Sequence, residues 1–221
     1  MADEPRAYAW HWQEPLVLTV PGFRNSGPGH WQTLWEDKRA DCRRAELGMW
    51  DAPHRNTWVN KLNLAIRRAD RPVVLAAHSL GCLAVAWWAE FERPECGNPV
   101  IGALLVAPPD VDRPGRDPGL SGLSSCPRRP LPFPAFLVAS QDDPYCDFRT
   151  AQGLAKDWDC RFVDAGAQGH INADSGLGDW GFGEQLLERL LRQHSQSLRE
   201  SRQPAGVAET AASSSKQLPA S

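Results

Sequence analysis

Short apolar runs alternate with longer amphipathic segments along most of this 221-residue chain, and this alternation limits the possible folds more than any other feature. The run at residues 73–77 (VVLAA) is apolar at every position, so a strand formed from it has both faces buried. Strands of this kind, separated by helices, imply a parallel sheet that is covered on both sides. With right-handed crossovers, the sequence predicts a doubly wound α/β sandwich of about six strands, in one domain over residues 15–194.

The apolar periodicity also predicts where the elements lie. Strands are expected at residues 16–20, 73–77, 100–106, 136–139 and 161–163, with a weak edge strand near 45–50. Helices are expected at residues 30–39, from an N-cap at Asn56 through residue 66, at 83–91, at 148–158 and around the leucines of 186–191.

Three parts of the chain fall outside this pattern. Residues 1–14 are expected to be an N-terminal extension, and residues 195–221, which lack aromatic side chains, are expected to be a disordered tail. Residues 108–134 are rich in proline, glycine and serine and follow the expected strand at 100–106. Loops of this length are usually functional or mobile, so this segment is expected to border any site at that strand end.

The charged residues nearly balance, with 24 Lys and Arg against 27 Asp and Glu and a formal net charge of -3. This balance provides no electrostatic footprint for nucleic acid or an anionic membrane, so neither partner is expected. The apolar stretch 72–89 is long enough to cross a membrane. Its interruption by His78, Ser79 and Gly81 favours a buried strand, a tight turn and a buried helix instead.

The six cysteines are scattered, with no C-x-x-C pair and no Cys/His cluster at zinc-ligand spacing. The first 15 residues are polar and acidic, without the basic segment and apolar run of a secretory signal. We therefore expect free thiols in a reducing cytoplasm and no bound metal.

The strongest local motif is Ala77-His78-Ser79-Leu80-Gly81, between an expected strand and an expected helix. A serine in such a sharp turn projects its hydroxyl above the sheet as a nucleophile, and the crowded turn requires small residues two positions before and after it. The usual pattern has glycine at both places, so Ala77 is a departure by one methyl group. The side chain of His78 is expected to point away from the site and to pack in the core.

A serine hydroxyl becomes nucleophilic only when an oriented base removes its proton. In this architecture an acid and then a histidine should follow, each just past a later strand. Asp142 and Asp143 follow one such strand and His170 follows the last. Asp143 is favoured as the orienting acid because the restricted position before Pro144 could fix its carboxylate, whereas Asp142 is the alternative or a cap of the following turn. Asp164 lies directly at the strand end and is expected to be structural.

Acyl transfer also needs donors for the developing oxyanion. The backbone amide of Leu80, directly after the serine, is one candidate. Gly22 lets the backbone of the loop after the first strand approach closely, so the amide of Phe23 is the second candidate. An alternative that stays open is that the glycines of this loop only form a turn. No Gly-rich turn is followed by Lys-Ser or Lys-Thr, so a phosphate-binding loop is not expected.

Several motif blocks are spread over residues 15–191. They are 21–23 (PGF), 26–32 (SGPGHWQ), 78–82 (HSLGC), 142–146 (DDPYC), 169–172 (GHIN) and 176–180 (GLGDW). In these blocks the chain resembles the small serine hydrolases of the YdeN and retinoblastoma-binding-protein-nine group. The resemblance implies an α/β-hydrolase fold with little or no lid and a catalytic triad at Ser79, Asp143 and His170. The animal members are associated with binding a pocket protein, through a short segment that this sequence lacks, so that partner is not expected here.

The sequence thus predicts a serine hydrolase that cleaves carboxylic esters, or alternatively amides or thioesters, without a cofactor or metal. Its expected partner is a small-molecule acyl substrate, with small or exposed acyl groups favoured because no long helical insertion could build a lipid tunnel. Trp31, Trp35 and Tyr145 are candidates to line the substrate pocket, although helix packing explains the two tryptophans equally well.

The competing hypothesis is a protein-interaction module on a hydrolase scaffold with little or no activity. Its surface would be formed by residues 108–134 and several tryptophans, and its partner is unknown.

Overall fold

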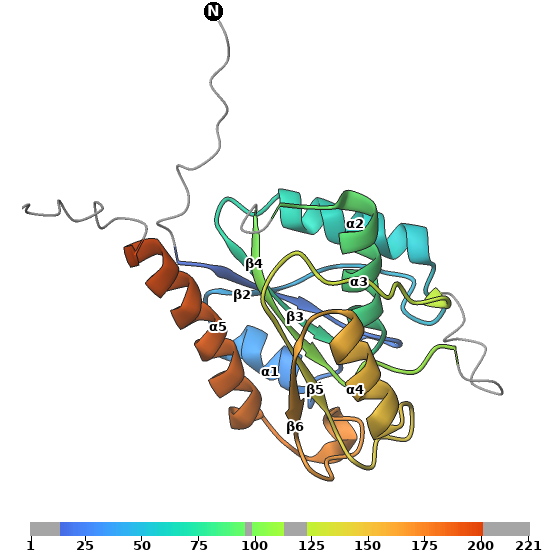
Figure 1. The fold of residues 1–221 in the computed structure, drawn as a ribbon. Helices are drawn as coiled ribbons and strands as arrows, with labels where there is room; N and C mark the ends of the chain where they lie inside the picture. Colours follow the sequence, from blue (N-terminus) through green and yellow to red (C-terminus); the bar gives the residue numbers. More distant parts are fainter. Residues whose placement is uncertain (1–13, 96–98, 113–122, 201–221) are drawn as a thin grey trace, which may run out of the picture.

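The computed structural model describes residues 14–95, 99–112 and 123–200. Within these ranges a parallel sheet lies between two layers of helices, which confirms the predicted α/β sandwich (Figure 1). The strands are β1 (Leu16–Val20), β2 (Cys42–Arg44), β3 (Val73–His78), β4 (Val100–Val106), β5 (Ala135–Ala139) and β6 (Arg161–Asp164). The helices are α1 (Trp31–Lys38), α2 (Arg55–Arg67), α3 (Leu80–Glu92), α4 (Phe148–Asp157) and α5 (Gly181–Glu200), with a 3₁₀ turn η2 (Ala173–Ser175).

The strand order is β2-β1-β3-β4-β5-β6, and every neighbouring pair is parallel. The chain runs from β1 outward to β2 and then returns to place β3 on the other side of β1. The connections that leave the carboxyl ends of β1 and β3 therefore diverge, and a crevice forms at such a reversal in open α/β sheets.

The two faces of the sheet bury separate apolar clusters. Helices α2, α3 and α4 cover one face, where Leu75 of β3 packs with Trp58 and Leu83, and α1 and α5 cover the other, where Val74 packs with Trp35 and Leu187 (Figure 1). Consecutive strand residues alternate between the clusters because side chains along a strand point to opposite faces. This double burial explains why the strands read as continuous apolar runs.

Several element boundaries differ from the prediction. The edge strand β2 lies at Cys42–Arg44 rather than near 45–50, because Gly48 and Met49 adopt left-handed backbone conformations that turn the chain away from the sheet. The N-cap of α2 is His54, without a side-chain capping bond, so Asn56 lies inside the first turn rather than capping it.

The last helix is also longer than expected. It continues to Glu200, so residues 195–200 are helical rather than part of a disordered tail, in keeping with the good helix formers there. The rest of the expected tail, residues 201–221, lies outside the described residues, as do residues 1–13 of the extension and 113–122 of the proline-rich segment. Across the described ranges, no helix combines the length and the apolar character needed to cross a membrane.

Candidate active site

Ser79 lies in a strained turn between β3 and α3. Its backbone has φ 53° and ψ -126°, a conformation that costs an L-residue free energy and is found mainly at functional sites. The turn is crowded by the end of β1: a Cβ at Gly81 would lie 2.1 Å from the carbonyl oxygen of Val20 and 2.8 Å from that of Pro21. Only glycine fits at this position, whereas Ala77, on the other side of the serine, is accommodated in the buried end of β3.

The structure brings Ser79, His170 and Asp143 together from three separate loops. Nε2 of His170 lies 3.0 Å from Oγ of Ser79, and Nδ1 lies 2.9 and 3.0 Å from the two carboxylate oxygens of Asp143. The side chains of His170 and Asp143 are only 9% and 3% exposed, so water competes little for these contacts. The carboxylate holds the Nδ1–H tautomer, which leaves the Nε2 lone pair facing the hydroxyl.

The two neighbouring aspartates are divided between two tasks. Asp142 does not contact the imidazole; its Oδ1 accepts hydrogen bonds from the Ser140 hydroxyl and the Gly169 amide, both at 2.7 Å. These bonds, with the hydroxyl contributing most, lower the pKa of the Asp142 carboxyl. The turn-capping role considered for Asp142 falls instead to Asp143, whose Oδ1 accepts from the amide of Tyr145 at 2.9 Å.

Two side chains form hydrogen bonds with the backbone of the loop that carries His170. The His78 side chain, expected to point away from the site, instead lines the cleft and lies 2.9 Å through Nε2 from the carbonyl oxygen of His170. Since a carbonyl can only accept, this His78 nitrogen carries the proton, and burial holds the pKa of the ring well below its usual range. Trp31 donates its indole N–H to the carbonyl of Ile171 at 3.0 Å.

The substrate-binding roles expected for the aromatic residues separate in the structure. Trp31 and Trp35 belong to α1 and are buried against Trp180 in the apolar cluster under α5, so they do not line the cleft. Tyr145 is 47% exposed and lines the cleft, with its ring centroid 4.5 Å from that of His170. Asp164, expected to be structural, accepts hydrogen bonds from the Gly166 amide and the Gln141 side chain.

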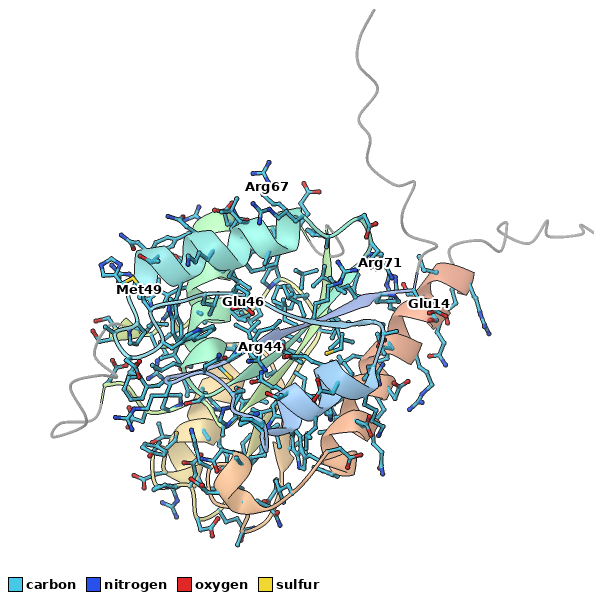
Figure 2. The ribbon with its side chains drawn as sticks, turned by 180° about the vertical axis from the view of Figure 1, so that it is seen from behind. Glu14, Arg44, Glu46, Met49, Arg67 and Arg71 are labelled. Atoms are coloured by element: carbon cyan, nitrogen blue, oxygen red, sulfur yellow. The ribbon has the colours of Figure 1, made fainter. Side chains whose placement is uncertain are left out.

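A cleft of about 330 Å³ opens above Ser79. Side chains that carry charge or form hydrogen bonds make up much of its wall beyond the serine and His170: Arg24, Asn25, His30, Asn172 and Asp174. The loop after β1 that supplies the first three is held by Arg44, which lies on the edge strand β2 (Figure 2). Its guanidinium donates hydrogen bonds to the Asn25 side chain and to the carbonyl of Ser26, both at 3.2 Å.

Two backbone amides are available beside the serine. Within the described part of the chain, neither the Leu80 nor the Phe23 N–H donates a hydrogen bond to another protein group. Gly22 brings the loop after β1 close to the turn, because a Cβ there would lie 2.7 Å from Cβ of Ser79 and 3.1 Å from the Leu80 nitrogen. The close approach expected of Gly22 is therefore present.

His30 is a cleft residue that the sequence did not single out. It is the N-cap of α1, where its Nδ1 accepts the Gln32 amide at 3.2 Å. Burial lowers the pKa of its imidazole to about 3, with a smaller contribution from His170. Its position at the start of the expected helix 30–39, inside the 26–32 block, was the available signal. Among the described residues, no group of three or more His, Cys, Asp or Glu side chains is arranged to hold a metal ion.

Comparisons with known proteins show the family and the fold of this chain. A family model described as "Serine hydrolase" matches residues 17–189. A YdeN-like hydrolase from Pectobacterium atrosepticum is 32% identical, with a TM-score of 0.71 over 84% of this chain and 94% of that one. The ydeN gene product of B. subtilis is 22% identical, with a TM-score of 0.65 over 80% and 99% of the two chains.

A more distant structure shares the fold alone: Est1E from Butyrivibrio proteoclasticus, solved with ferulic acid, is 14% identical, with a TM-score of 0.58 over 84% of this chain and 90% of that one. The comparison with curated proteins gives no match. The family model spans well over half of the chain, and this protein therefore belongs to the serine hydrolase family, as a YdeN-type member of the α/β-hydrolase superfamily.

Proposed function

We propose that the protein is a carboxylesterase that hydrolyses small or exposed acyl esters through an acyl-enzyme on Ser79. The observation that carries this proposal is the single imidazole of His170, 3.0 Å from the serine hydroxyl and bonded on its other nitrogen to a nearly buried carboxylate. This arrangement supplies a base for the nucleophile and a partner that stabilises the imidazolium.

The reaction proceeds in two halves. Oγ of Ser79 attacks the ester carbonyl while its proton passes to Nε2 of His170, and the oxyanion is stabilised by the amides of Leu80 and Phe23. The tetrahedral intermediate collapses, the C–O bond to the alcohol breaks, and the alkoxide takes the proton from His170. Water then attacks the acyl-enzyme with His170 as base, and the carboxylic acid and the free Ser79 hydroxyl are restored.

The size of the cleft supports a small substrate. Its volume of about 330 Å³ lies at the lower end of the range for small-molecule sites. The mixed polar lining suits short acyl groups better than long aliphatic chains. The free thiols of Cys42, Cys82, Cys126 and Cys160 fit the reducing cytoplasm expected from the sequence, and we include that location in the proposal.

The test combines covalent labelling with turnover. A fluorophosphonate probe should label the wild-type protein, and 4-nitrophenyl esters of increasing acyl length should be hydrolysed with a preference for short chains. The Ser79→Ala variant should lose both activities, whereas Ser195→Ala, a serine exposed on α5, should keep them. Labelling of folded Ser79→Ala at the wild-type rate would overturn the assignment of the nucleophile. Absence of both labelling and hydrolysis in the wild type would instead favour the interaction-module hypothesis.

A further inference from the structure

Gln32 is a polar residue of α1 that is completely buried, with 0% of its surface exposed. Its side-chain amide is hydrogen-bonded at both ends: Nε2 donates to the carbonyl of Ala76 at 2.8 Å, and Oε1 accepts from the hydroxyl of Ser26 at 2.5 Å. A carbonyl can only accept, so the nitrogen must face Ala76 and the oxygen must face Ser26. A buried amide is costly unless its groups are paired, so the two bonds act together as one link.

This link joins the two segments that supply the proposed oxyanion donors. Ala76 lies on β3, which ends in the turn that carries the Leu80 amide. Ser26 is buried in the loop after β1, the same loop that carries the Phe23 amide. Gln32 therefore fixes one donor-bearing segment relative to the other.

The turn that carries Phe23 needs support from outside. Its own hydrogen bond runs from the amide of Asn25 to the carbonyl of Gly22, at 3.1 Å. Arg24 and Asn25 have φ 60° and 64°, in the left-handed region, where side chains other than glycine cost free energy. Such a conformation persists only when the surrounding structure holds it. Ser26 comes directly after the strained pair, so the bond of its hydroxyl to α1 fixes the end of the turn.

We propose that Gln32 is a positioning residue for the oxyanion hole, which sets the distance between the Phe23 and Leu80 amides before substrate binds. This inference rests on the proposed esterase function. Donors aimed at the oxyanion matter most in the transition state, because the carbonyl oxygen of the ester gains its charge there. A displacement of about 1 Å can cost on the order of 10²-fold in rate, so a loosened loop should lower kcat more than it raises KM.

The experiment breaks the link at either end and then at both ends. Gln32→Met keeps the length of the side chain without its hydrogen bonds, and Ser26→Ala removes the hydroxyl while the bond from Gln32 to Ala76 can remain. With 4-nitrophenyl acetate, each variant should lower kcat by about 10- to 100-fold and change KM by less than about 3-fold. The double variant should lose no more than about 2-fold beyond the larger single loss, because one link can be broken only once.

A transition-state analogue separates positioning from a general loosening of the fold. Butyl trifluoromethyl ketone adds to the serine hydroxyl, and the oxyanion of the resulting hemiketal occupies the oxyanion hole. Its inhibition constant should rise in each variant by about the factor by which kcat falls. The matched control is Asn63→Leu, which removes a side-chain amide bond of 3.2 Å to Trp88 between α2 and α3. This control should leave kcat and the inhibition constant unchanged, even where it lowers the melting temperature.

The outcomes separate the two proposals. If the wild type does not hydrolyse the ester, the esterase function itself is wrong. If it does, but a folded Gln32→Met or Ser26→Ala variant keeps the wild-type kcat or raises KM instead, only the role of Gln32 is overturned. Single losses that multiply in the double variant would overturn it as well. Should Gln32→Met fail to fold, Ser26→Ala alone decides, since it removes a single oxygen from the link.

Discussion

His78 lies 2.9 Å through Nε2 from the carbonyl oxygen of His170, although the two residues are 92 positions apart in the sequence. Its neighbour Ser79 meets the side chain of the same histidine at 3.0 Å. Two consecutive residues of the turn after β3 therefore hold the main chain and the imidazole of His170 at once. These two hydrogen bonds therefore set the distance between Oγ of Ser79 and Nε2 of His170, although the two residues lie 91 positions apart in the sequence.

We predict that His78→Phe lowers kcat for a short ester by about 10- to 100-fold, because the ring remains but the hydrogen bond that positions the base is lost. KM should change less than kcat, since the phenyl ring takes the place of the imidazole in the cleft wall. His78→Gln, which can present an N–H, should recover part of the loss, and thermal unfolding should show both variants folded. Wild-type kcat in a folded His78→Phe variant would contradict the positioning role.

The adjacent aspartates provide a matched pair. Asp143→Asn should lower kcat by about 10³- to 10⁴-fold, because an amide no longer holds the productive tautomer or stabilises the imidazolium. Asp142→Asn should cost less than about 10-fold at neutral pH, because its amide oxygen can still accept the Gly169 N–H. Steady-state kinetics with one short 4-nitrophenyl ester measures both. Equal losses would mean that the geometry around His170 does not separate the roles of the two carboxylates.

The lowered pKa of Asp142 predicts a pH dependence of stability. A carboxyl whose pKa is lowered on folding stabilises the protein above the unfolded-state pKa, near 4, and this contribution disappears as the pH falls through the folded-state pKa. The stability advantage of the wild type over Asp142→Asn should therefore shrink as the pH is lowered from 7 toward 3. Thermal unfolding of both proteins across this range measures the difference. An advantage that stays constant or grows toward acid would exclude this linkage.

Two glycines in helices should respond to alanine in opposite directions. Gly81→Ala should destabilise by about 1–3 kcal/mol or more, because its Cβ would meet rigid backbone oxygens of the loop after β1. Gly153→Ala, in α4 with no atom within 4 Å of its Cβ, should stabilise by about 0.5–1 kcal/mol. Urea unfolding provides both free energies. An unchanged free energy of unfolding in Gly81→Ala would show that the turn and β1 are less tightly packed than the structure has them.

The fold was predictable from the sequence to the extent that burial is a local pattern. Continuous apolar runs located β1, β3, β4 and β5 within one residue, because strands buried on both faces are apolar at nearly every position. The half-exposed β6 was located from the shorter apolar pair Phe162-Val163. The short edge strand β2 was misplaced, since half-exposed Cys42–Arg44 carries no such signal. The start of α3 was expected three residues too late, because a helix that begins inside a strained turn lacks an ordinary capping residue.

The candidate site likewise has features that the sequence predicted and features that it did not. Chain order alone placed a serine, an acidic pair and a histidine at the ends of three strands. It did not indicate that His78 would bond to the loop of His170, that Trp31 would be buried beneath that loop, or that His30 would reach the cleft. Each of these depends on a contact between residues far apart in the chain.

By itself, then, the sequence determined the layered architecture and the strand ends at which reactive side chains gather. It could do so because the burial pattern of a strand or helix and the conformation of a tight turn depend on residues that are close in the sequence. Only the tertiary structure decided which carboxylate faces the imidazole of His170 and which histidine bonds to the backbone of its loop. A hydrogen bond forms only within a few tenths of an ångström of its preferred length and near its preferred angle. These distances and angles are set when separate loops pack over one edge of the sheet.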